Sequence, residues 1–288
     1  MKKRKKRTSN FKISNKKLAR FIKLLREDKK IFALFGALLS LVLIIGSTFA
    51  WSSYSSWVDN HMQSETGMLD VRVSETFEQD SVLLPDTIIQ KEVNVRNNSD
   101  KLAVIRVKLI ESTTLFELNK QTGALLTKEK EAADKEVDRE DTKTWEKGNL
   151  YKDNLSGDKY YVLKDIVKDK VFDFSGTTQR DEHLKKFNLG FSNAIKLTTD
   201  PNATDPYWVY EDGYFYYSKV LKKNETTAVD LLQTMSLLAK DQKNNMKNEL
   251  YNLDITAYGV IANNESLKEW NVSSAIREMF EKDSAFTK

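Results

Sequence analysis

Cysteine is absent from this chain of 288 residues. Disulfide bridges, iron–sulfur clusters, thiolate zinc sites and cysteine nucleophiles are therefore excluded, and stability must come from packing. Histidine is scarce, and the two present, His61 and His183, do not stand at ligand spacing, so neither is expected to bind a metal. The motifs of nucleophile elbows, zincins and phosphate-binding loops are also missing.

These absences leave no recognisable catalytic constellation. The 42 Asp and Glu residues are too numerous for the sequence to single out a glycosidase pair. We therefore expect a protein that is not an enzyme, with no cofactor, no metal site and no catalytic residue.

The chain has ample apolar material but an uneven charge. It is 40% hydrophobic and 10% aromatic, enough to bury one substantial core or two modest ones. Of the 46 Lys and Arg residues, 14 lie in residues 1–50, together with only 2 of the 42 acidic residues, so residues 51–288 carry 32 basic and 40 acidic residues. The basic character belongs to residues 1–30.

An apolar run follows this basic segment. Residues 31–50 (IFALFGALLSLVLIIGSTFA) carry no charge, and their length is sufficient to cross a hydrocarbon core of roughly 30 Å. A basic flank, an apolar run and small residues at its end are the layout of an export signal. The positive-inside rule places residues 1–30 in the cytoplasm before cleavage and the rest outside, so we expect the flank to face a membrane and not nucleic acid.

Two interpretations of the apolar run remain open. Thr48 and Ala50 stand at suitable positions for signal cleavage between Ala50 and Trp51. We therefore expect cleavage there. The alternative is a retained membrane anchor, which the full length of the run and the long basic flank favour. In both cases 1–50 is a separate segment, 51–67 is an extended arm rich in Ser and aromatic residues, and 68–288 is the folded domain.

Alternating apolar and polar residues predict strands along this domain. They lie at residues 68–73, 88–96, 103–110, 159–163, 207–221, 226–232 and 250–261. We expect 88–96 and 103–110 to pair as an antiparallel hairpin with one solvent-exposed face. Strands at irregular spacing, without a βαβ rhythm, predict a mainly β fold, an antiparallel β-sandwich.

Three local features complete the pattern. The segment 207–221 predicts an aromatic hairpin turning at Glu211-Asp212-Gly213, whose rings are expected in the core in preference to a glycan-binding platform. Residues 127–149 carry interleaved charges of both signs, which predicts a solvated helical or loop insertion. Residues 266–270 and 273–280 predict short C-terminal helices, the second capped by Ser273.

Four segments also stand out by their order and spacing. They are the signal end 46–51 (GSTFAW), the turn 84–87 (LPDT) leading into 91–97 (KEVNVRN), the strand 103–109 (AVIRVKL), and 212–217 (DGYFYY) with 219–221 and 225–227. Together they resemble exported proteins of the TasA/BsaA type, whose signal peptides are cut by an alternate, SipW-like signal peptidase. The chain departs from that family at Asp86, where Gly is usual, and at 222–224, where a Pro-Gly turn is common.

The resemblance implies a jelly-roll-like sandwich exported from a Gram-positive-type cell and assembled into fibres of a biofilm matrix or at the cell surface. It implies three partners: a signal peptidase of the SipW type, the membrane during export, and copies of the chain or other matrix subunits. Our hypothesis for assembly is that the arm adds as a strand to an open sheet edge of the next subunit. Its anchoring side chains are expected to be Trp51, Tyr54, Trp57 and Val58. The alternative is a membrane-anchored extracellular binding module for a glycan or protein ligand.

Overall fold

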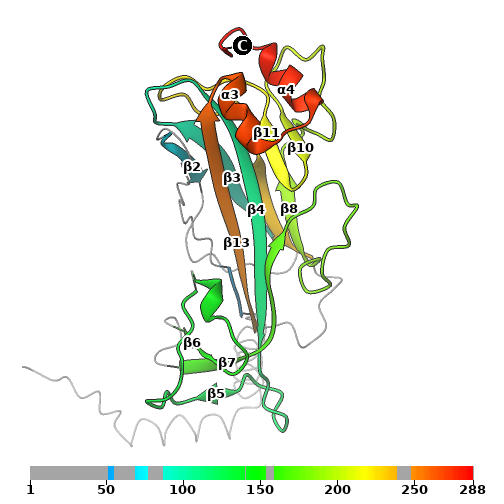
Figure 1. Ribbon diagram of the computed structural model, residues 1–288. Coiled ribbons are helices and arrows are strands. Elements are labelled where there is room, and N and C mark those ends of the chain that lie inside the picture. The colour runs from blue at the N-terminus through cyan, green and yellow to red at the C-terminus, as the bar shows by residue number, and fades with distance from the viewer. Residues whose placement is uncertain are drawn as a thin grey trace, which may run out of the picture. The chain divides into compact units, whose positions relative to one another are not determined.

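The computed structural model describes residues 51–54, 69–76, 87–139, 141–153, 159–238 and 248–287 (Figure 1). Residues 51–288 form one compact unit, separate from residues 1–50. The predicted signal segment, including Ala50, lies outside the described residues, as do Trp57, Val58 and His61 of the expected arm. In the part of the chain that is described, no helix has the length and apolar character needed to span a bilayer.

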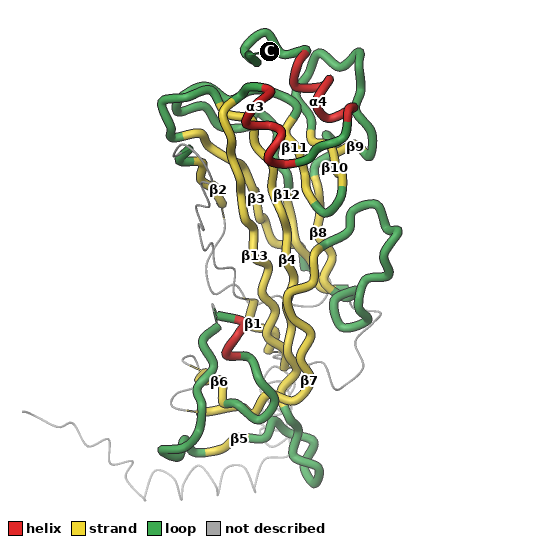
Figure 2. Tube along the Cα trace, viewed as in Figure 1, coloured by secondary structure: helices red, strands yellow, loops and turns green. Residues whose placement is uncertain are grey.

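The unit is built from two sheets (Figure 2). The larger contains β1 (Trp51–Tyr54), β4 (Ala103–Phe116), β5 (Thr127–Lys128), β6 (Leu150–Asp153), β7 (Lys159–Val171), β9 (Ile195–Lys196), β10 (Trp208–Glu211), β11 (Tyr214–Tyr217) and β13 (Asn248–Ile261). The smaller contains β2 (Val71–Thr76), β3 (Ile88–Asn97), β12 (Leu232–Leu237) and β8 (Phe187–Phe191), in that order. Most pairs are antiparallel; β1 with β13 and β9 with β10 are parallel.

The longest pairing joins β4 to β13. It runs without a register shift from Ala103 opposite Ile261 to Leu115 opposite Glu249. On its other side, β4 pairs with β11 near its start and with β7 near its end. The strand therefore has neighbours along both edges, which places it inside the nine-stranded sheet.

The main core lies between the two sheets and confirms the expected mainly β, jelly-roll-like sandwich. Alternate residues of facing strands fill it, because successive side chains of a strand point to opposite faces. Its fully buried members include Val93, Val95, Ile105, Val107, Leu109, Leu232, Met235, Leu253 and Ile255.

A second layer covers the outer face of the larger sheet. It is formed by α3 (Asn264–Leu267), the 3-10 turn η4 (Lys268–Trp270) and α4 (Ser274–Glu281), which lie over the β11 end of the sheet (Figure 1). Ile276 and Phe280 of α4 pack with Val104 of β4 in this layer. The Ser273 hydroxyl accepts a hydrogen bond from the Ile276 N–H at 3.3 Å, so the predicted helices and cap are confirmed.

Two strand predictions are wrong in detail. Strands β3 and β4 belong to different sheets and do not form a hairpin, because the chain crosses from one sheet to the other after Asn97. The Asn97 amide fixes that crossing by donating to the carbonyls of Lys101 and Leu221 at 2.8 and 3.0 Å. The strand expected at 226–232 begins only at Leu232, since the preceding residues touch β3 at isolated backbone bonds and form no continuous ladder with it.

The charged insertion is a loop structure, as one of the two expectations had it. Its described residues contain β5 and one 3-10 turn, η1 (Thr142–Thr144), and most are exposed. Val137 and Trp145 are buried, at 6% and 1% exposure, and the Trp145 indole N–H donates to the Asp138 carbonyl at 2.9 Å. These two side chains anchor the loop to the small cluster formed with β6 and β7.

The two sheets approach closely at Gly259. A Cβ placed on Gly259 of β13 would lie 2.6 Å from a methyl carbon of Val71 in β2. We predict that Gly259→Ala lowers the free energy of unfolding by about 1–3 kcal/mol through overpacking, measured by urea denaturation. Val71→Ala in the same chain should remove the clash, so the double variant should lose less than the sum of the two single losses. Strict additivity would contradict this.

Candidate assembly edge and its buried polar network

The first residues of the expected arm lie along the edge of β13 that faces away from β4. The first four arm residues form β1, which pairs with β13 in parallel, Trp51 opposite Asn248 and Tyr54 opposite Tyr251. From Asn252 to Ile261, β13 pairs with β4 alone among the strands that the structure describes. An edge of this kind offers unpaired backbone groups to a further strand.

Beneath the paired stretch of β13, charged side chains close one end of the core. The Glu111 carboxylate on β4 is 1% exposed and accepts hydrogen bonds from the Arg180 guanidinium, one of them at 2.9 Å from Nε. The Tyr251 hydroxyl donates to the same carboxylate at 2.7 Å. Arg180 also donates to the Phe187 carbonyl at 2.7 Å, which ties the loop before β8 to β4.

A second pair continues this network. The Lys186 ammonium contacts the Glu249 carboxylate, with side-chain exposures of 1% and 2%, and the Thr113 hydroxyl donates to Glu249 Oε1. Burial raises the pKa of the Glu249 carboxyl, an effect opposed by the nearby Lys186 charge. We refer to Glu111, Thr113, Arg180, Lys186, Glu249 and Tyr251 as the buried polar network.

The network and the arm share one stretch of strand. Glu249 and Tyr251 lie within the four β13 residues that pair with β1, and their side chains are buried on the core side. On β2 and β3, Lys91 and Glu75 make a further buried pair at 2.8 Å, in which burial lowers the pKa of Lys91 despite its partner. Ion pairs in the interior are costly to break, so they hold these strands in one arrangement.

The aromatic hairpin is core, as expected. Its turn residues Asp212 and Gly213 have φ of 49° and 82°, the left-handed pair of a two-residue hairpin turn. Six of the seven rings are buried: Tyr207, Trp208, Tyr210, Phe215, Tyr216 and Tyr217. Tyr214 is half-buried beneath the Arg106 guanidinium, which lies 4.0 Å from the ring centroid.

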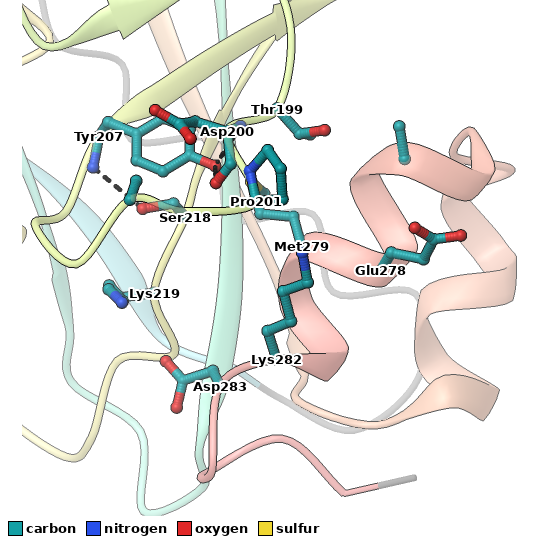
Figure 3. A pocket seen from close by; sticks show the side chains of 12 residues that line it. Thr199, Asp200, Pro201, Tyr207, Ser218, Lys219, Glu278, Met279, Lys282 and Asp283 are labelled. Carbon is teal, nitrogen blue, oxygen red and sulfur yellow. Dashed lines mark hydrogen bonds between the residues drawn. The ribbon is translucent and has the colours of Figure 1, made fainter.

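A surface pocket of about 270 Å³ lies between the 199–207 loop and α4 (Figure 3). Two of its three acidic groups have protein partners. Asp283 accepts the Val220 N–H at 3.0 Å, and Asp200 accepts from Lys196 at 2.6 Å. Figure 3 shows Tyr207 held in the pocket wall by bonds to Ser218 and to the Asp200 backbone.

Metal-binding groups do not gather in the described part of the chain. Among those residues no three His, Asp or Glu side chains are close enough together to hold an ion. His183 lies half-buried in the loop before β8, where its backbone N–H donates to Asp181 at 2.9 Å.

The sequence alone did not identify the buried polar network. One signal was available for Glu249, because it continues the inward alternation of Tyr251, Leu253 and Ile255 along β13. Arg180 and Lys186 lie in a charged loop and carry no such pattern.

Comparison of the chain with family models, curated proteins and solved structures gave no match.

The first prediction from this site concerns Arg180. Removing it by Arg180→Ala leaves the Glu111 carboxylate buried without its counter-ion, which should lower the free energy of unfolding by about 3–5 kcal/mol. The matched control is Arg72→Ala, which breaks a pair with Asp70 whose side chains are 55% and 34% exposed and should cost at most about 1 kcal/mol. Guanidinium denaturation measures both, and equal losses would refute the assignment.

A second prediction concerns alkaline pH. Burial, with the Asp173 carboxylate nearby, raises the pKa of Tyr210 from 10.0 to about 12. Because the unfolded state releases this proton first, the contribution of Tyr210 to stability is complete below pH 10 and is lost as pH rises through about 12. Tyr210→Phe should flatten the fall in stability over this interval. An unchanged pH profile of unfolding would contradict the shift.

Proposed function

We propose that this protein is a secreted structural subunit, forming or joining fibres of an extracellular biofilm matrix. One observation carries the proposal: the residues directly behind the expected cleavage point form β1 along the edge of β13 that faces away from β4. The mature N-terminus and a strand-accepting edge therefore belong to the same chain. The mainly β sandwich and the resemblance to TasA/BsaA-type proteins also support it.

The mechanism is an exchange of β1 between subunits. The backbone groups of β13 at 248–251 are the same whether β1 comes from the same chain or from a neighbour. Exchange therefore costs little in hydrogen bonds and replaces an internal contact by one between subunits. Each subunit gives an arm to one neighbour and accepts an arm from another, so the contact does not close and the assembly grows as a filament.

Signal cleavage controls the start of this process. Cutting between Ala50 and Trp51 by a signal peptidase of the SipW type frees the arm from the membrane. Retention of 31–50 instead holds the chain at the cell surface as an anchored binding module. The apolar run of residues 31–50 is unbroken and long enough to cross a membrane, and this observation supports the second function.

Deletion of residues 51–63 from the mature protein should abolish polymerisation, because the donated strand is gone. Sedimentation velocity and electron microscopy measure the outcome. A finer pair of variants tests the ladder itself: Ser52→Pro with Ser53→Pro removes the backbone donors of both residues, one of which faces β13, whereas Ser52→Thr with Ser53→Thr keeps them. We expect fibres only from the Thr pair, with the domain still folded in both. Normal fibres from the deletion or from the Pro pair would refute the mechanism.

A further inference from the structure

Lys186 and Glu249 meet across the core from opposite sheets. Lys186 directly precedes β8, and its carbonyl accepts the Leu238 N–H at 2.9 Å, so its backbone belongs to the smaller sheet. Glu249 is the second residue of β13 in the larger sheet. Their ammonium and carboxylate are in contact at 1% and 2% exposure. This is the one described ion pair that links the two sheets with both side chains almost fully buried.

The surroundings of this pair are largely closed to water. The Phe187 ring stacks on Tyr251, with centroids 4.0 Å apart, and the Lys186 Nζ lies 5.5 Å from the centroid of the Phe187 ring. The Thr113 hydroxyl donates to Glu249 Oε1, on the carboxyl group that Lys186 contacts. An amine and a carboxyl group are thus held together, with a hydrogen-bond donor on the carbonyl oxygen.

The charges of the pair are expensive in this setting. Taking an ammonium and a carboxylate out of water carries a desolvation cost that their mutual attraction often fails to recover. Proton transfer within the pair gives a neutral amine and a neutral acid, and the raised pKa of Glu249 shows burial acting in that direction. Fixed proximity replaces the encounter that the same two groups would need in solution.

We infer that Lys186 and Glu249 condense into an intramolecular amide bond that joins the two sheets covalently. The Lys186 Nζ lone pair attacks Glu249 Cδ, and the Thr113 hydroxyl stabilises the charge that develops on Oε1. The Cδ–Oε2 bond breaks, and Oε2 leaves as water with two of the three ammonium protons. The third proton stays on the amide nitrogen. The step needs no oxidant, cofactor or external proton.

The bond provides a covalent cross-link in a chain that has no cysteine and therefore cannot form a disulfide. It closes the chain between residues 186 and 249 and thereby restricts the unfolded state, as a disulfide does. The bond forms within one subunit and does not depend on fibre assembly. A test of the bond is therefore independent of a test of the proposed function.

Intact mass spectrometry of the mature protein, denatured before measurement, tests the inference directly. The mass should be lower than that of the sequence by one water molecule. Trypsin should then yield a branched peptide joining residues 186–196 to residues 248–268, because a modified Lys186 is not cleaved. A mass equal to that of the sequence would refute the bond without any variant.

Two substitutions of matched kind locate the bond. Lys186→Arg keeps a buried cation opposite Glu249 but carries no amine, so the water loss and the branched peptide should both disappear. Lys91→Arg makes the same change in the other buried pair, which lies between neighbouring strands of one sheet, and the water loss should persist. Persistence in Lys186→Arg, or loss in Lys91→Arg, would overturn the assignment. On a denaturing gel the wild type should migrate as a more compact chain than Lys186→Arg.

Discussion

The pairing of β4 with β13 is the interaction on which the rest of the structure depends. It is the longest ladder in the described residues, and its register determines which side chains of β4 and β13 point to each face of the larger sheet. One face of this ladder meets the smaller sheet and makes the main core, while the other carries the helical layer and the insertion cluster. A slip of one residue would turn the inward side chains of one of the two strands, such as Ile105 or Ile255, out of the core, so the register determines both layers.

At the end of this ladder that lies near β1, polar and charged side chains replace apolar ones on the core side. Toward the β1 end of β13 the inward residues are Glu249 and Tyr251, and the nearby inward residues of β4 are Thr113, opposite Tyr251, and Glu111, opposite Leu253. Satisfied polar networks define one arrangement more strictly than apolar contacts do, because each donor needs a particular acceptor. The residues of β13 that pair with β1 include Glu249 and Tyr251 of this network. In the proposed assembly, these contacts would preorganise the strand that accepts the arm.

The features that the sequence predicted correctly depend on residues that are close together in the chain. The β10–β11 hairpin followed from alternation around Asp212 and Gly213, and the α4 cap followed from Ser273, because each depends on residues a few positions apart. The partner of β4 could not be read, since Ala103 and Ile261 are far apart in the chain and many apolar strands compete for one edge. The prediction of a hairpin between β3 and β4 was wrong for the same reason.

The buried polar network could not be predicted from the sequence, because charged residues are usually exposed. Its members also come from separate parts of the chain: β4, β13 and the loop before β8. Cleavage at Ala50 and the role of the arm remain predictions.

The positions of β1 and Thr287 at opposite ends of β13 have a mechanical consequence. The N-terminal strand β1 lies beside the first residues of β13, and near the C-terminus Thr287 bridges to Asn263, just beyond the last residue of β13. A pulling force applied between these two places acts along the axis of β13. The hydrogen bonds between β1 and β13 lie across that axis and are loaded together, in shear, instead of opening one after another. The proposed fibre would therefore resist stretching through the short β1–β13 ladders between its subunits.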